Sequence, residues 1–323
     1  MKILITSAGR RVSLVRSFQN ELKKIDPNGK VYATDSNPNL SAACQVADGF
    51  FKVPELKEAN YIDELLAYCN SQGINLVIPT IDTELVILAK NKNRFEEQNI
   101  KVIVSDIDFV TICRDKRKTH EFFSQHAINV AKEYDKNNYT LPVYIKPVDG
   151  SRSIDNYLIK TKDVFTNYHF ENEKLMFLEY LSHDIYDEFT CDLYYGKDHK
   201  LKCVVPRKRL EVRSGEVYKA LTVHNSLVDC IKKNLSYIDG VIGCVTSQFF
   251  LHKEDKDKIF GIELNPRFGG GYPLTYLAGA NYSKWLLEEY LLNKTIDEQF
   301  DVWEKDLLMM RYDDEILIHG YKS

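Results

Sequence analysis

The stretch that decides the fold of this chain runs from Phe260 to Gly271 and reads FGIELNPRFGGG. Glu263 and Asn265 stand two residues apart, and side chains at such positions of a β-strand point to the same face. Ile262 and Leu264 would face the opposite side, into a core. Hard cations such as Mg²⁺ take oxygen ligands of this kind, together with water and phosphate. The stretch therefore indicates a magnesium site at a strand end, with an edge strand and a solvated glutamate as the open alternative.

The residues that follow this strand suit a bound phosphate. Pro266 cannot continue the hydrogen-bonded ladder of a sheet, so the strand should end there. Arg267 carries a rigid fork of donors that matches phosphate oxygens. The glycines at 269–271 let the backbone pass close to a ligand. A phosphate beside the metal ligands is therefore the prediction for this turn.

The composition of the chain points to a cytoplasmic protein and excludes several kinds of partner. Its 323 residues, of which 44% are hydrophobic, are enough for two or three packed units. A net charge of −4 provides no basic field that would attract nucleic acid. The seven cysteines include no C-x-x-C pair, as expected of reduced thiols, and no apolar run approaches the length of a membrane span. The opening residues, MKILITSAG, predict a strand rather than a signal peptide.

The first hundred residues alternate between short apolar strands and amphipathic helices. The predicted strands are 2–6, 31–33, 76–79 and 102–104, and the predicted helices are 10–22, 61–71 and 84–93. This alternation implies right-handed crossovers and a doubly wound parallel sheet. Ligands of such sheets bind beyond the carboxyl ends of the strands. The residues expected at those ends are Gly9, Arg10, Arg11, Asp35, Thr80, Asp82 and Glu84.

A dinucleotide site is one interpretation of the turn after the first strand, with Asp35 as the ribose ligand. The G-x-G-x-x-G fingerprint is absent, however, because only Gly9 is present in the turn. Arg10 and Arg11 suit an anionic substrate better. The alternative is that both arginines simply open a helix on the surface.

The middle of the chain offers groups for a triphosphate. The segment PVYIKP, residues 142–147, predicts a strand that places Lys146 on one face, and the loop Gly150-Ser151-Arg152-Ser153 follows at once. A point charge beside a small, hydroxyl-rich loop with free backbone N–H groups is what a triphosphate needs. The same residues also fit an ordinary hairpin turn.

Further polar groups recur on the segments that follow. Glu179 lies in the apolar run 175–181, where it could accept hydrogen bonds from an adenine edge. Glu188 begins a strand whose alternate residues share a face. Arg207, Arg209 and Arg213 would project from one face of another strand, unless they form a solvated charge run.

Taken in order, these motifs carry a family resemblance. They are Asp115-Lys116, Ile145-Lys146-Pro147 with Gly150-Ser151-Arg152-Ser153, Glu179-Tyr180-Leu181, Glu188-Phe189-Thr190-Cys191-Asp192, Pro206-Arg207-Lys208-Arg209, Gln248 and Glu263-Leu264-Asn265-Pro266-Arg267. This order resembles the ATP-grasp superfamily, and within it single-module proteins related to the carbamoyl-phosphate synthetase large subunit. The resemblance covers nearly the whole chain, and the order and spacing of the motifs are more specific than any one of them.

The resemblance implies an architecture of the α/β and α+β classes. Residues 1–106 would form a Rossmann-like pre-ATP-grasp domain with a doubly wound parallel sheet. Residues 107–176 would form the small, lid subdomain of the ATP-grasp fold. Residues 177–323 would form the large subdomain that carries the metal site.

The resemblance also implies a role for each matching residue, with ATP and Mg²⁺ as cofactors. The nucleotide ligands would be Lys116, Lys146, the loop with Gly150, Ser151 and Ser153, Glu179 and Leu181 at the adenine, and Glu188 at the ribose; the metal ligands would be Gln248, Glu263 and Asn265. Arg267 would contact the transferred phosphoryl group. From their placement, the five arginines Arg10, Arg11, Arg207, Arg209 and Arg213 are expected to face one cleft. Arg207 and Arg209 are the expected catalytic residues near that transfer, and the substrate residues are expected to be Arg10, Arg11, Arg213, Asp35 and Asp82. The synthetase modules commonly have arginines at the positions of Lys116 and Lys146 and a glycine-rich loop in place of Ser-Arg-Ser.

The expected function is that of an ATP-dependent ligase. The enzyme would phosphorylate a carboxylate, and an amine or thiol would then displace the phosphate, with ADP as the other product. Two alternatives remain open, a phosphoryl transferase and a nucleotide-binding protein without catalysis. Carbamoyl phosphate synthesis is not expected, because the chain has one module and no glutamine amidotransferase. The partners would be small-molecule acids and amines, and a homodimer is possible because similar proteins often dimerise.

Overall fold

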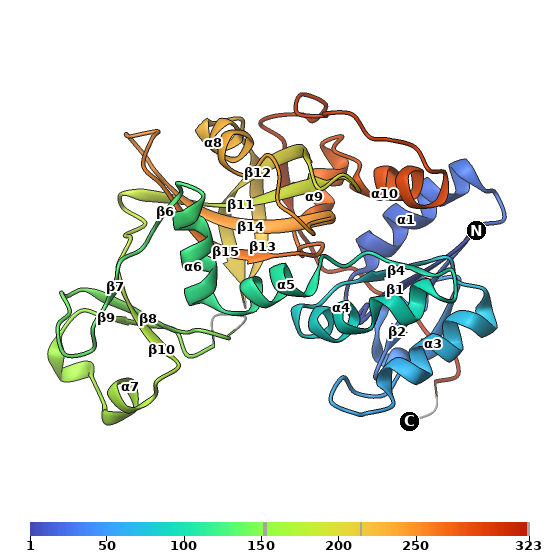
Figure 1. Cartoon of the computed structure of the whole chain (residues 1–323), viewed down its shortest axis with the longest axis horizontal. Helices are drawn as coiled ribbons and strands as arrows, with labels where there is room; N and C mark the ends of the chain where they lie inside the picture. The colour runs from blue at the N-terminus through green and yellow to red at the C-terminus, as the bar shows by residue number, and fades with distance from the viewer. Residues whose placement is uncertain (151–153, 214, 322–323) are drawn as a thin grey trace.

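A computed structural model of the chain describes residues 1–150, 154–213 and 215–321. It contains three β-sheets, and the seven-stranded sheet lies between the five-stranded sheet on one side and the four-stranded sheet on the other (Figure 1). The five-stranded sheet belongs to the N-terminal part, and the other two lie beyond it. The predicted N-terminal parallel-sheet domain is confirmed, and the part that follows it contains two largely antiparallel sheets.

The N-terminal sheet is entirely parallel and has the order β3-β2-β1-β4-β5. Its elements are β1 (Lys2–Thr6), α1 (Val12–Ile25), β2 (Lys30–Asp35), α2 (Ala42–Val46), β3 (Gly49–Lys52), α3 (Tyr61–Gln72), β4 (Leu76–Pro79), α4 (Asp82–Glu96) and β5 (Lys101–Val102). The central strands are buried on both faces, which explains why β1 and β4 are apolar without alternation. The edge strand β3 was not predicted, because it reads GFFK and has one phenylalanine on each face, so no alternation of apolar and polar residues marks it.

The seven-stranded sheet has the order β16-β13-β12-β11-β14-β15-β6. Its elements are α5 (Ile107–Arg114), α6 (Lys116–Gln125), β6 (Asn129–Val130), β11 (Tyr186–Tyr195), β12 (Leu201–Arg213), β13 (Glu216–Thr222), α8 (Ser226–Asn234), β14 (Gly243–His252), β15 (Ile259–Asn265), α9 (Tyr272–Leu277), α10 (Tyr282–Leu291) and β16 (Leu308–Met310). The long central strands pair antiparallel and provide most of the large core. The sheet is therefore the platform on which residues far apart in the sequence can meet.

The four-stranded sheet forms a smaller lobe with the order β7-β10-β8-β9. Its elements are β7 (Glu133–Tyr134), β8 (Val143–Pro147), β9 (Tyr157–Ile159), α7 (Asn167–Glu171) and β10 (Leu175–Glu179). One face of this sheet packs into its own small core around Val143, Ile145 and Phe177, and Phe170 of α7 packs against Phe177. The other face is left for contact with the large sheet.

The sheets suggest a different lobe boundary from the one expected. The boundary expected after residue 176 falls inside β10, which pairs with β8 over its whole length. At the other end, Phe109, Phe122 and Phe123 of α5 and α6 pack into the core of the large sheet. We therefore propose that the lid comprises residues 131–180 and that both helices belong to the large lobe.

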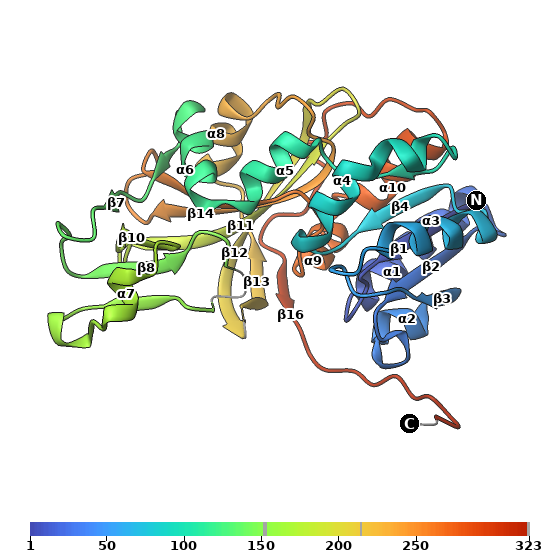
Figure 2. The same ribbon diagram turned by 60° about the horizontal axis from the view of Figure 1, so that its bottom comes forward.

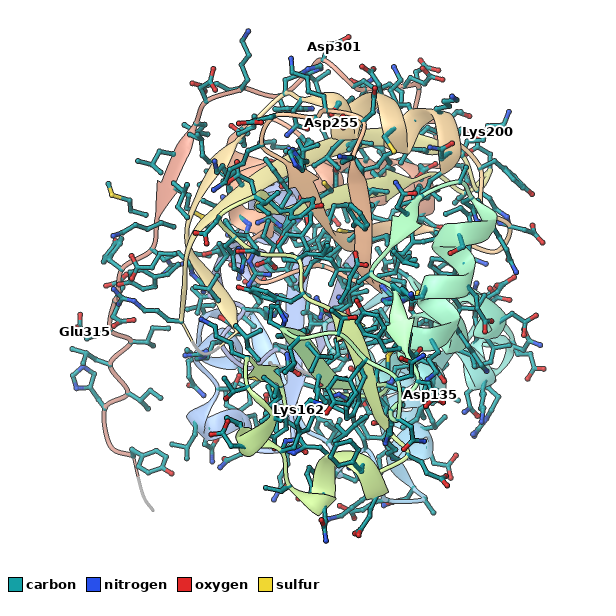
Figure 3. All side chains as sticks on the ribbon, turned by 90° about the vertical axis from the view of Figure 1, so that its left-hand side faces the viewer. Asp135, Lys162, Lys200, Asp255, Asp301 and Glu315 are labelled. Atoms are coloured by element: carbon teal, nitrogen blue, oxygen red, sulfur yellow. The ribbon has the colours of Figure 1, made fainter. Side chains whose placement is uncertain are left out.

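The C-terminal segment returns along the molecule to the N-terminal part. Strand β16 pairs with β13, and the chain then runs past the N-terminal domain to its end (Figure 2). Figure 3 shows Glu315 on this segment, well apart from Asp135 and Lys162 of the small lobe. Over the described residues, no helix has both the length and the apolarity needed to cross a bilayer.

Candidate functional site

The predicted metal residues lie side by side on the large sheet. Glu263 of β15 stands directly opposite Gln248 of β14, and Asn265, two residues further, stands opposite Thr246. Leu264 is buried in the core, as expected. Ile262 is not, because an irregularity in the pairing at this point leaves it half-buried. One carboxylate and two amide groups therefore share one face of the sheet.

Both predicted lysines approach this set from the small-lobe side. Lys146 is on β8 and is 6% exposed, and Lys116 opens α6. The Nζ atom of Lys116 donates a hydrogen bond of 2.6 Å to the carbonyl of Gly150, the first residue of the predicted phosphate loop. Gly150 must be glycine here, because a Cβ atom would lie 2.3 Å from Pro147 Cγ. Ser151 and Ser153 lie outside the described residues.

The two lysines and Glu263 act on one another electrostatically. Burial and the charge of Lys116 lower the pKa of Lys146 to about 8, while Glu263 opposes the shift. Burial also lowers the pKa of Lys116, again against the effect of Glu263. His120 of α6 faces the same region, and burial with the charges of both lysines lowers its pKa to about 3. The region thus holds one buried lysine, one half-buried lysine and one neutral imidazole, which favours binding of a polyanion.

The lobes meet along an apolar face of the small sheet. Lys146 pairs with Met176 across the strands, and Tyr144 pairs with Leu178. These four side chains therefore share the face of the small sheet that is opposite its own core. Met176 and Leu178 are buried, yet neither belongs to a hydrophobic core cluster. Burial and the charge of Glu188 on the large sheet contribute to the raised pKa of Tyr144. This face therefore looks onto the large sheet.

The other predicted nucleotide residues border the same junction. Glu179 ends β10, and Leu181 lies in the link that leads to β11 of the large sheet. Glu188 forms an ion pair of 2.8 Å with Arg209 of β12, and neither side chain is more than 20% exposed. These residues stand where the two lobes are joined.

Arg267 connects the metal strand with the N-terminal domain. Its Nη2 atom lies 2.6 Å from the carboxylate of Asp82 at the start of α4. Burial alone would lower the pKa of Arg267, but Asp82 and Glu263 raise it. The substrate residue predicted at Asp82 therefore holds the predicted phosphoryl-binding arginine.

Arg207 lies beneath the glycine turn instead of lining a surface. It is 1% exposed and pairs at 2.9 Å with Asp192, which is fully buried. Asp192 also accepts hydrogen bonds from Thr246 and Thr275. A Cβ atom on Gly271 would lie 2.0 Å from Arg207 Nη1, so the turn can cross the guanidinium only with glycine at this position. We assign Arg207 a positioning role under the turn.

The five arginines of the predicted substrate cleft do not form one group. Arg213 lies on the far side of two pairing irregularities in β12, pairs with Glu211 and is 57% exposed. Arg11, at the start of helix α1, lies close to Arg267, whereas the side chain of Arg10 is 83% exposed and approaches Glu216 instead. Separately, Asp35 accepts hydrogen bonds from the N–H groups of Gly9 and Asn37, so it shapes the turn after β1.

Two residues of this region were missed from the sequence. Arg311 follows β16 and pairs with Glu216, which begins β13 next to the turn at Gly215. Glu216 also lies 3.6 Å from Arg10. Neither residue belongs to a periodic pattern in the sequence. The available signals were weak: Glu216 follows an arginine-rich strand, and Arg311 is a single arginine after LLMM.

Two family models match the sequence. The model described as PylC-like, N-terminal domain, matches residues 3–103, and the model described as ATP-grasp in the biosynthetic pathway with Ter operon matches residues 171–312. No curated protein matches the sequence significantly.

Several solved structures share the fold at low sequence identity. The biotin carboxylase domain of Hydrogenobacter thermophilus 2-oxoglutarate carboxylase, in complex with MgADP and bicarbonate, is 13% identical with a TM-score of 0.69, over 95% of this chain and 73% of that one. The L-amino acid ligase of Bacillus licheniformis is 15% identical with a TM-score of 0.67, over 92% and 75%. The N5-carboxyaminoimidazole synthetase of Staphylococcus aureus is 16% identical with a TM-score of 0.66, over 92% and 78%. Residues 171–312 therefore belong to the ATP-grasp superfamily and residues 3–103 form a PylC-like N-terminal domain, and the three sheets agree with both matches.

Proposed function

We propose that the protein is an ADP-forming ligase that activates a carboxylate with ATP and joins it to an amine or a thiol. ATP and Mg²⁺ are the cofactors of this superfamily. The observation that carries the proposal is the convergence of Lys116, Lys146 and Glu263 between the two antiparallel sheets. The similar structures named above include two ligases or synthetases, which supports this class of reaction.

The donor set at the strand end fits a magnesium ion. Glu263, Asn265 and Gln248 offer one carboxylate and two amide oxygens on neighbouring strands. Among the described residues, no group of three or more His, Cys, Asp or Glu side chains could hold a metal. A mixed set of this kind suits Mg²⁺, which is commonly held by one or two carboxylates and by substrate phosphates. When bound, Mg²⁺ would neutralise charge on the phosphate oxygens.

The nucleotide would lie between the lobes. Lys116 and Lys146 would hold its phosphates as point charges, and the apolar side chains of Met176 and Leu178 would cover the adenine. Glu179 and the backbone of Leu181 would bind the adenine edge, and Glu188 the ribose. Because Glu188 is paired with Arg209, ribose binding would share or replace that ion pair. In this arrangement Arg209 positions Glu188.

The reaction would proceed in two displacements. A carboxylate oxygen of the acid attacks the γ-phosphorus, the bond to ADP breaks, and an acyl phosphate forms. The amine nitrogen then attacks the acyl carbon, inorganic phosphate leaves, and the nitrogen loses a proton. Arg267 lies near Glu263 and would stabilise the charge on the transferred group. Positioning and charge neutralisation supply most of the catalysis in such transfers.

The test is an assay of ADP release with Mg-ATP, a panel of carboxylic acids and hydroxylamine as the trapping amine. A ligase gives acid-dependent ADP together with a hydroxamate, and Glu263→Gln should abolish both. ADP with a stable phosphorylated product and no hydroxamate would instead identify a phosphoryl transferase. ATP binding without ADP release for any acid would leave only a nucleotide-binding protein. The unpaired cysteines support a cytoplasmic location for this activity, and a homodimer is part of the proposal, to be checked by light scattering.

A further inference from the structure

A cluster of four arginines lies where the N-terminal domain meets the large sheet. Arg10 and Arg11 come from the turn before α1, Arg267 from the turn after β15, and Arg311 from the segment after β16. Figure 2 shows β16 and the following segment passing between β13 and the N-terminal domain. Three segments far apart in the sequence thus deliver guanidinium groups to one place.

Among the residues that the structure describes, two carboxylates form ion pairs with these four guanidinium groups. Asp82 binds Arg267 at 2.6 Å. Glu216 lies 3.2 Å from Arg311 and 3.6 Å from Arg10. Glu263 also acts on Arg267, but it belongs to the proposed metal set. The cluster therefore carries more positive than negative charge.

Two donor atoms of the cluster are buried without a partner. The Nη1 atom of Arg11 and the Nε atom of Arg267 are inaccessible to solvent and donate no hydrogen bond to any described residue. Within the described part of the chain, the one hydrogen bond that the Arg11 side chain donates is a long one of 3.4 Å, to the carbonyl of Thr80. A buried charged donor without an acceptor is costly, unless a ligand supplies the acceptor. Both atoms lack the acceptor that an anion would provide.

The helix start and the glycine turn add to this picture. Arg10 and Arg11 precede the N-terminus of α1, a helix of 14 residues, where the helix dipole already favours anions. The two arginines add positive charge at this end of the helix, where acidic side chains would have neutralised the dipole. Gly270 faces the same place, because a Cβ atom on it would lie 3.6 Å from Arg11 Nη1 and 3.7 Å from the Glu216 carboxylate carbon. A small group can therefore fit there without a clash.

We propose that this cluster binds a second anionic group of the acid substrate, so that the acid is at least a dicarboxylate or a phosphorylated acid. The inference rests on the ligase function proposed above. The carboxylate to be activated would lie near Arg267 and the metal set, and the second anion would lie among Arg10, Arg11 and Arg311. The carboxylate of Glu216 repels that anion, so it lowers the affinity and restricts binding to strongly charged groups.

The first test measures binding without catalysis. The full chain is titrated calorimetrically with succinate and with acetate at equal ionic strength, with MgADP present to fill the nucleotide site. We expect succinate to bind at least tenfold more tightly than acetate. Arg10→Gln and Arg311→Gln should each weaken succinate binding about tenfold, since a charge-assisted hydrogen bond is lost. Arg94→Gln, which removes an exposed arginine paired with Asp63 elsewhere on the N-terminal domain, is the matched control and should change nothing.

Two further variants give effects that a purely structural role would not produce. Glu216→Gln removes the competing carboxylate and should tighten succinate binding several-fold, although it also removes two ion pairs. Gly270→Ala places a methyl group in front of Arg11 and should weaken succinate binding while ATP binding is kept. Equal binding of acetate and succinate, or weaker binding in Glu216→Gln, would overturn the inference.

The outcomes separate this inference from the ligase proposal. Selective succinate binding with no ADP release for any acid would refute the ligase and keep the anion site. Acid-dependent ADP release that is equally efficient with monocarboxylates and dicarboxylates, without selective binding, would refute the anion site and keep the ligase. Acid-dependent release that prefers dicarboxylates and declines in Arg311→Gln would support both.

Discussion

At the scale of single residues, the titration of Lys146 should make both the stability of the protein and its affinity for ATP depend on pH. The pKa of this lysine is lowered to about 8 by burial and by Lys116. The folded protein therefore holds fewer protons than the unfolded chain between about pH 8 and the ordinary lysine value near 10.5. Stability should rise with pH across that window, because the fold disfavours the charged form. His120 is already neutral there, since its pKa is about 3.

Nucleotide binding should show the opposite dependence on pH. Phosphates favour the charged lysine, so ATP binding at pH 9 should take up close to one proton, and affinity should decrease by up to about tenfold per pH unit above pH 8. Calorimetry in buffers of different ionisation enthalpy measures this uptake. Lys146→Met should bind ATP more weakly at pH 7 and lose the proton uptake. Uptake that persists in the variant would assign the titration to another group.

The metal residues lead to a second prediction at this scale. Glu263→Gln keeps the shape of the side chain but removes the only carboxylate of the set, so ADP release should fall at least a hundredfold. The thermal midpoint without ligands should change little, because Glu263 lies half-buried on the face of a strand and not in the core. The control is Asp255→Asn, in the exposed loop that joins β14 to β15. A variant that kept wild-type turnover would remove Glu263 from the metal site.

At the scale of elements, the pair of Arg207 and Asp192 ties β11 to β12 under the glycine turn. Both side chains are buried, so Arg207→Ala leaves an uncompensated carboxylate inside the protein. Such a loss costs about 3–5 kcal/mol, and urea unfolding should show a decrease of this size. Arg213→Ala, on the exposed end of the same strand, should change the free energy of unfolding by less than about 0.5 kcal/mol. Equal effects of the two substitutions would contradict the positioning role of Arg207.

The predicted elements that proved correct are those with a strong local signal. The fully apolar β1 and β4, the alternating β8 and the strand ending at Pro266 were all predicted with nearly the right bounds. The start of α1 was placed two residues too early, and this matters because Arg11 then stands at the helix start, where it can approach Arg267. Periodicity fixes the body of an element better than its ends.

The parts that could not be predicted depend on pairing between distant segments. Strand β16 has three residues and forms only by pairing with β13, almost ninety positions earlier. Arg311 reaches the site through that pairing, and Glu216 reaches it through the turn between β12 and β13. The irregularities in β12 likewise separate Arg213 from Arg209, which a regular alternation would have placed together. A local pattern holds no information about such contacts.

At the scale of the whole molecule, the site needs all three sheets. The small sheet contributes Lys146, the large sheet contributes Glu263, and the N-terminal domain contributes Asp82 and the two arginines before α1. Two of these contributions come from the carboxyl ends of parallel strands, where α/β sheets usually bind ligands. The N-terminal domain is therefore part of the proposed substrate site and not only an attachment to it.

The ion pair of Asp82 with Arg267 provides a test of whether the N-terminal domain takes part in the site. It joins the start of α4 to the turn after β15 at 2.6 Å, with both side chains at most 20% exposed. Asp82→Asn removes the partner that fixes the guanidinium, so Arg267 should lose its position at the transferred phosphoryl group. We expect kcat to fall at least tenfold while the affinity for ATP, held by the lobes, stays within about twofold.

A double-mutant cycle with Asp82→Asn and Arg267→Gln separates this coupling from independent damage. For groups in direct contact, the coupling in the free energy of unfolding should be about 0.5–3 kcal/mol. In kcat, the double variant should be no slower than Arg267→Gln alone, because Asp82 acts only through that arginine. Additive losses in kcat would show that Asp82 contacts substrate directly, as the sequence alone suggested, and that the N-terminal domain takes part in the chemistry through its own carboxylate.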